Sequence, residues 1–122
     1  MKNPSQYDEK LSRELILERL EGSQELLAEL IQLFLEETPQ LIDAMRGALE
    51  KGDMQELAQS AHAMKGAASN FTAYATTNAA AQLETDAKNG DVESAKARLE
   101  ALEAATERLL PELAGLCRGA AK

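Results

Sequence analysis

The stretch DMQELAQSAHAMKGAASNF, residues 53–71, decides the fold and contains His62, the only histidine among 122 residues. Steps of three and four residues separate its apolar positions, which therefore line one face of a helix: Met54, Leu57, Ala61, Met64, Ala68 and Phe71. At about 100° per residue, His62 lies about 130° from the middle of that stripe. We therefore expect the imidazole to point at solvent.

The residues around His62 favour a functional site over an incidental surface histidine. Gln59, Gly66 and Ser69 fall on the same side of the helix, and Lys65 lies on its flank. Glycine in an exposed helix costs about 1 kcal/mol relative to alanine, yet alanine is used freely on both sides of Gly66. This choice indicates that the empty space at Gly66 is needed. The alternatives are a solvated surface histidine and a satisfied core histidine, and the second conflicts with the position of His62 off the apolar stripe.

The run AHAMKG followed by AASNF resembles the signature of the histidine phosphotransfer (HPt) domain. That signature is a histidine, a hydrophobic residue two positions later, a Lys-Gly pair and a run of small residues. His62 matches the phospho-accepting histidine, and Lys65 and Gly66 match the Lys-Gly pair. The resemblance extends through FLEETPQL and LETDAKNGD and covers roughly residues 18–113. Thr72 departs from it, because the family often has glycine at this place.

The resemblance implies a phosphoryl carrier. His62 would accept and donate a phosphoryl group, relaying it between receiver-domain aspartates in a two-component phosphorelay. Lys65 and Gly66, with Gln59 and Ser69, would stabilise the phosphoryl group or dock the partner. That partner would be a receiver domain of a hybrid sensor histidine kinase, of a response regulator, or of both. It would also hold any magnesium, so no cofactor or metal is expected on this chain.

Composition limits the other functions. A net charge of −8 argues against binding to nucleic acid or to an anionic membrane. The lone Cys117 provides neither a disulfide framework nor a cysteine metal site. The sequence lacks a signal peptide, a membrane-length apolar run, a Gly-rich nucleotide loop and a kinase motif. We expect a cytoplasmic, monomeric carrier without kinase activity.

The chain is rich in Leu and Ala and poor in aromatic residues, which favours an all-α fold. Glycine and capping residues divide it into five expected helices: 8–20, 23–51, 53–70, 73–88 and 92–116. Thr72 is the expected N-cap of the fourth helix, and Tyr74 and Leu83 are its larger anchors. The apolar phase is the same on both sides of Pro39, which favours one kinked helix over two. Residues 1–7 and 118–122 are expected to fray.

We predict one domain over residues 1–122, with an ordered helical core at about 8–116. Its fold would be an antiparallel up-down four-helix bundle with a short extra N-terminal helix at one end. A helical hairpin that dimerises into a bundle is the alternative.

Two other functional classes remain. A metal or haem bundle would need several inward-facing His or Glu ligands, which a single outward histidine does not supply. A helical-bundle adaptor or dimerisation module is the stronger rival. It predicts that His62 can be replaced without loss of activity.

Overall fold

The computed structural model describes residues 13–71 and 73–120, and within these ranges every regular element is a helix. The five helices follow one another with short connections: α1 (Arg13–Arg19), α2 (Gln24–Lys51), α3 (Met54–Ser69), α4 (Tyr74–Lys88) and α5 (Val92–Ala120). The all-α prediction is therefore confirmed.

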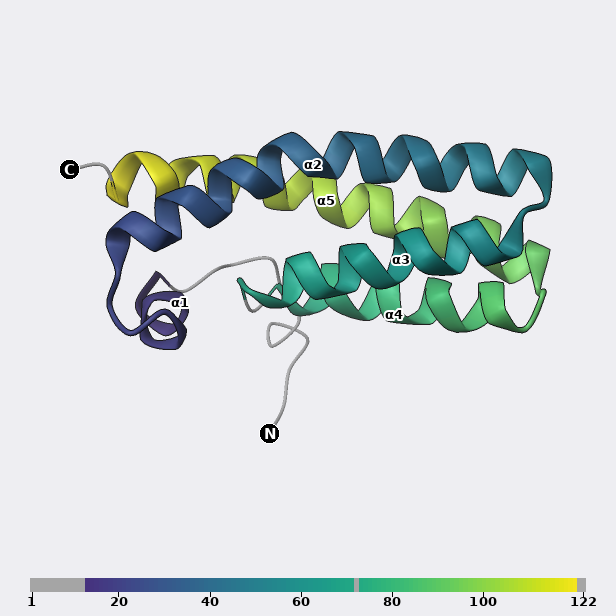
Figure 1. The fold of residues 1–122 in the computed structure, drawn as a ribbon, viewed down its shortest axis with the longest axis horizontal. Helices are drawn as coiled ribbons and strands as arrows, with labels where there is room; N and C mark the ends of the chain where they lie inside the picture. Colours follow the sequence, from purple (N-terminus) through teal and green to yellow (C-terminus); the bar gives the residue numbers. More distant parts are fainter. Residues whose placement is uncertain (1–12, 72, 121–122) are drawn as a thin grey trace.

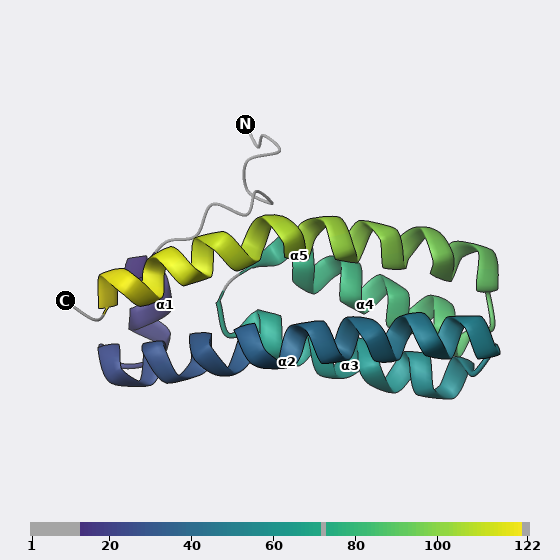
Figure 2. The ribbon, with the colours of Figure 1, turned by 90° about the horizontal axis from the view of Figure 1, so that it is seen from above.

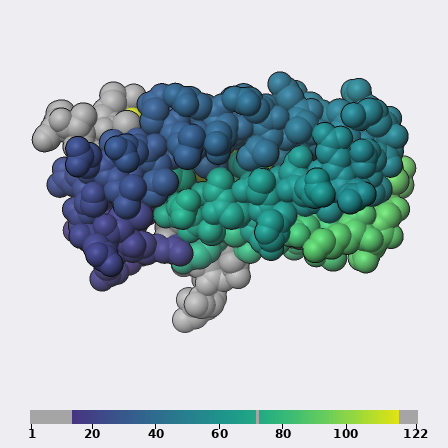
Figure 3. Space-filling model, in the orientation of Figure 1, coloured from purple at the N-terminus to yellow at the C-terminus, as the bar shows by residue number. Residues whose placement is uncertain are grey.

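Helices α2 to α5 form an antiparallel bundle (Figures 1 and 2). Each helix packs on the next one in the chain, and α5 returns to pack on α2. The bundle is thus complete within one chain, and a second copy is not needed to cover α2, as the alternative dimeric hairpin required. Figure 3 shows α2 and α3 side by side on one face, with α1 at one end. The guanidinium of Arg19 donates to the Ser69 carbonyl at 2.8 Å, which links α1 to the end of α3.

Capping groups fix where the long helices begin. The Ser23 hydroxyl accepts a hydrogen bond from the Leu26 N–H at 3.0 Å, and the Asp53 carboxylate accepts one from Glu56 at the same distance. Gly52 ends α2 with φ +73°, a left-handed conformation that side chains disfavour. The expected cap of α4 was wrong. Ala73 occupies the N-cap and offers no side-chain hydrogen bond, while Thr72 lies outside the described residues.

Helix α2 is continuous through Pro39, as predicted. Its buried positions keep one phase along the whole length: Leu27, Ile31, Phe34, Thr38, Ile42, Met45 and Ala48. Thr38 and Ile42 lie on either side of Pro39 and are both buried, so the buried stripe continues past the proline. The rings of Phe34 and Phe71 meet in a T-shaped arrangement with centroids 5.4 Å apart, so this stripe also anchors the end of α3.

Several boundaries and anchors differ from expectation. Tyr74 is 51% exposed and does not anchor α4, because it lies at the first helical position, off the buried stripe. Helix α5 continues to Ala120, beyond the expected end at 116. The expected helical residues 8–12 lie outside the described part of the chain. None of the helices described here combines the length and the apolar run that a membrane span requires.

The buried hydroxyl of Thr38 generates a stability prediction. Thr38 is 2% exposed, and its Oγ1 has no hydrogen-bond partner among the described residues. An unsatisfied buried hydroxyl costs about 1–3 kcal/mol. Replacing Thr38 by Val, which has nearly the same shape, should therefore raise the unfolding free energy by about 1 kcal/mol in chemical denaturation.

The matched control is Thr106→Val. The Thr106 hydroxyl is buried but donates to the Leu102 carbonyl, so its removal should stabilise less or destabilise. Equal gains at both positions would contradict the assignment of an orphaned hydroxyl to Thr38.

Candidate functional site

The phase of α3 sets the position of His62. Ala61 and Met64 point into the core and are fully buried, whereas the His62 side chain is 67% exposed. The helix thus presents the only imidazole of the chain on its outer surface, as the sequence predicted.

Glu84 from α4 is the centre of the site. Its side chain is only 9% exposed, and it touches three basic side chains. The Oε2 atom lies 3.0 Å from His62 Nδ1 and 3.1 Å from Lys88 Nζ, and Oε1 lies 3.1 Å from Lys65 Nζ. One buried carboxylate therefore brings together residues from two helices.

The two lysines keep this carboxylate ionised. Burial alone would raise the pKa of Glu84, but hydrogen bonds and charge from Lys65 and Lys88 outweigh it and lower the pKa to about 2. An ionised carboxylate only accepts hydrogen bonds. The Nδ1 atom of His62 must then carry the proton that it shares with Glu84, so in the neutral tautomer the lone pair is on Nε2, the nitrogen that does not face Glu84.

A hollow of about 440 Å³ opens beside the imidazole, lined by Ala58, Gln59, His62, Glu84 and Lys88. Of the predicted site residues, Gln59 therefore shares this hollow with His62, and Lys65 joins the cluster through Glu84. A Cβ atom added to Gly66 would meet no neighbour within 4 Å, so the surface above this turn of α3 is open.

Ser69 stands apart from the cluster. Its hydroxyl donates to the Gly66 carbonyl at 2.8 Å, and it lies two helical turns after His62. The structure therefore does not bring Ser69 to the Glu84 carboxylate.

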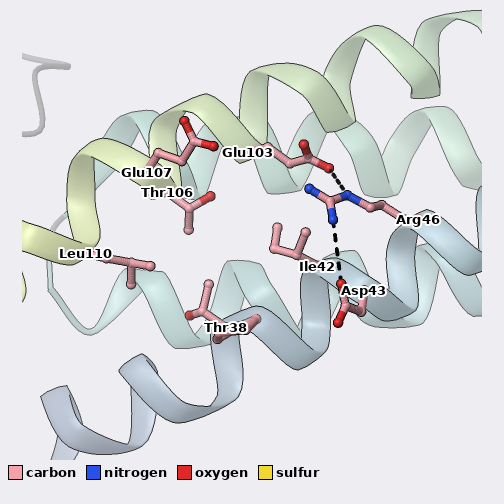
Figure 4. A pocket seen from close by; sticks show the side chains of 9 residues that line it. Thr38, Ile42, Asp43, Arg46, Glu103, Thr106, Glu107 and Leu110 are labelled. Atoms are coloured by element: carbon pink, nitrogen blue, oxygen red, sulfur yellow. Dashed lines mark hydrogen bonds and ion pairs between the residues drawn. The ribbon is translucent and has the colours of Figure 1, made fainter.

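A second hollow of about 230 Å³ lies between α2 and α5 (Figure 4). Arg46 closes one side through ion pairs to Glu103 at 2.7 Å and to Asp43 at 3.6 Å. The remaining lining includes Thr38 and Thr106 but no imidazole or thiol. The hollow lined by the imidazole is therefore the one beside α3 and α4.

Comparison with known proteins decides the family. A family model described as the Hpt domain matches residues 29–112. The chain belongs to the Hpt domain family. A crystal structure of the HPT domain from a sensor hybrid histidine kinase of Shewanella superposes with a TM-score of 0.79. The two chains are 17% identical over 91% of this chain and 96% of that one, a likeness that shows the fold. Curated protein sequences give no significant match.

Membership in the Hpt family gives the chain a phosphotransfer role in phosphorelays. Sequence reasoning found the histidine and the Lys-Gly pair but missed Glu84 and Lys88. A signal was available, because Glu84 lies on the buried stripe of α4 with Ala80 and Ala87. A charged residue on an apolar stripe requires a partner.

The depressed pKa of Glu84 predicts a pH-dependent contribution to stability. A folded-state pKa below the usual 4.5 means that the stabilisation is present above pH 4.5 and is lost as pH falls toward 2. The wild type should therefore be more stable than Glu84→Gln at pH 7, and the difference should shrink between pH 4.5 and 2. Urea unfolding at several pH values measures this difference.

The control for that series is Asp91→Asn, which removes an exposed carboxylate from the N-cap of α5. If the difference in unfolding free energy between the wild type and Glu84→Gln stayed constant from pH 7 to pH 2, the ion-pair assignment would be contradicted.

Proposed function

We propose that His62 is the phospho-accepting residue of a phosphorelay carrier, and that the phosphoryl group is held on Nε2. The observation that carries this proposal is the 3.0 Å contact between His62 Nδ1 and Glu84. It supports an imidazole that is held at Nδ1 by an anion and that directs its other ring nitrogen away from Glu84. Glu84 is then a positioning residue, because it acts through the imidazole.

The transfer step balances without an added proton. The Nε2 lone pair forms the N–P bond, and the P–O bond to a receiver aspartate breaks with its electron pair remaining on that carboxylate. The imidazole, now carrying Nδ1–H and a phosphoryl group, gains a positive ring charge beside the anionic Glu84. The reverse step returns the phosphoryl group to another aspartate.

The partner in this proposal is a receiver domain of a hybrid sensor kinase or of a response regulator. The receiver supplies the aspartate and any magnesium, since phosphoryl transfer needs positioning and charge neutralisation. The chain acts as a monomeric carrier without kinase activity. Gln59 contributes from the hollow beside His62, and the open surface at Gly66 admits the receiver. Ser69 and the local turn at Gly66 support the docking surface through their mutual hydrogen bond.

Replacing His62 by Gln should abolish incorporation of acid-labile phosphate from a phosphorylated receiver domain. The side chain is 67% exposed, so the helical circular dichroism spectrum and the melting curve should change little. Undiminished labelling of His62→Gln would contradict the phosphotransfer proposal and would favour the adaptor alternative.

Substitutions at Gly66 distinguish an effect on receiver docking from an effect on the phosphotransfer chemistry. Gly66→Ala should stabilise the bundle by up to about 1 kcal/mol, since the added methyl group meets no neighbour and alanine favours helix. Gly66→Leu should also fold but should obstruct the receiver. Displacing reacting atoms by about 1 Å already costs roughly a hundredfold in rate, so transfer from the receiver should slow by at least that factor.

Phosphoramidate provides the control, because this small donor needs no docked protein. Its reaction with Gly66→Leu should be nearly unchanged. Equal slowing with both donors would show that Gly66 serves the phosphate site or the backbone instead of docking.

A further inference from the structure

Lys88 lies at the site but is not part of the motif that contains His62, Lys65 and Gly66. It is the last residue of α4, and its side chain is 66% exposed. Its Nζ atom binds Oε2 of Glu84, the same oxygen that faces His62 Nδ1. Lys65, which is 35% exposed, binds the other oxygen. Lys88 also lines the hollow beside His62, together with Gln59.

This geometry keeps Lys88 close to the reacting ring. Its Nζ atom and His62 Nδ1 each lie about 3 Å from one oxygen, so they are at most about 6 Å apart. The exposed four-carbon stem of lysine can turn its ammonium through the hollow by changes of rotamer. A phosphoryl group on His62 is therefore within the range of this cation.

Phosphorylation of His62 changes the interactions at Glu84 Oε2, the oxygen that His62 and Lys88 share. While His62 is neutral, its Nδ1–H and the Lys88 ammonium both donate to Oε2 without repelling each other strongly. When the ring becomes positive, its hydrogen bond to Glu84 becomes charge-assisted, and it repels the ammonium beside it. At the same moment a phosphoryl group with anionic oxygens appears at Nε2. Lys88 is the more exposed of the two lysines and is the one that shares its oxygen with the ring.

We propose that Lys88 leaves Glu84 when His62 is phosphorylated and binds the phosphoryl oxygens, while Lys65 remains on Glu84. This rests on the proposed function of His62 and adds a second helix to the phosphoryl-binding site. Lys88 then stabilises both the transition state and the phosphohistidine, and it returns to Glu84 after the phosphoryl group leaves.

The test uses phosphoramidate and three variants of the full chain. Lys88→Gln should be labelled about tenfold more slowly than wild type, which corresponds to the loss of one charge-assisted hydrogen bond. Lys88→Arg should restore most of the rate. Lys96→Gln is the matched control, because Lys96 is a 57% exposed lysine that pairs with Glu93 on α5. It should be labelled like wild type.

A second measurement separates phosphoryl binding from a role in holding Glu84. A Glu-Lys pair four residues apart also stabilises a helix end, so loss of Lys88 could act by releasing the carboxylate. Because His62 is the only histidine, its ring nitrogens give one set of ¹⁵N signals. In unphosphorylated Lys88→Gln these signals should still report the Nδ1–H tautomer.

Each adverse result has one meaning. Equal labelling rates for Lys88→Gln and Lys96→Gln would overturn the proposal, and so would a slow Lys88→Arg variant. A changed tautomer in Lys88→Gln would overturn it in favour of a positioning role. If wild type itself takes up no phosphate at His62, it is the proposed function that fails, and the two failures are thus distinguishable.

Discussion

The close contact between α3 and α4 is the constraint on which the site depends. Buried alanines lie on both helices: Ala61 and Ala68 on α3, and Ala80 and Ala87 on α4. Small residues let two helix backbones approach, and a larger side chain would push them apart. Glu84 reaches His62 and Lys65 because the two helices lie this close, and it binds Lys88 one turn further along its own helix. The position of the carboxylate beside His62 therefore depends on how α3 and α4 pack.

The buried charge of Glu84 adds a second requirement to this contact. A carboxylate among alanines is stable only if it is paired, because desolvation of an isolated charge is costly. Lys65 from α3 and Lys88 from α4 supply that pairing. The Lys65–Glu84 ion pair also joins α3 to α4, whereas the Lys88–Glu84 pair lies within α4. A change in the register of α3 against α4 would expose or orphan the carboxylate, so the geometry around His62 is held by packing and electrostatics together.

The helices and the outward position of His62 could be predicted because both follow from local spacing. Apolar steps of three and four residues and the glycine turn at Gly52 act within a few residues of chain. Glu84 could not be placed in the same way, since it meets His62 across 22 residues and its contact depends on how α4 packs on α3. Tyr74 was misjudged because its size was given more weight than its phase.

The sharing of one carboxylate makes the site a single thermodynamic unit. Any replacement among His62, Lys65 and Lys88 alters the field that the other two experience at Glu84. Effects at groups in one network are not additive, so a double replacement cannot be reconstructed from its single ones. For a diverging lineage, this coupling means that positions 62, 65, 84 and 88 are not free to drift independently. A substitution at one of them changes the effect of substitutions at the remaining three, although they lie on two different helices.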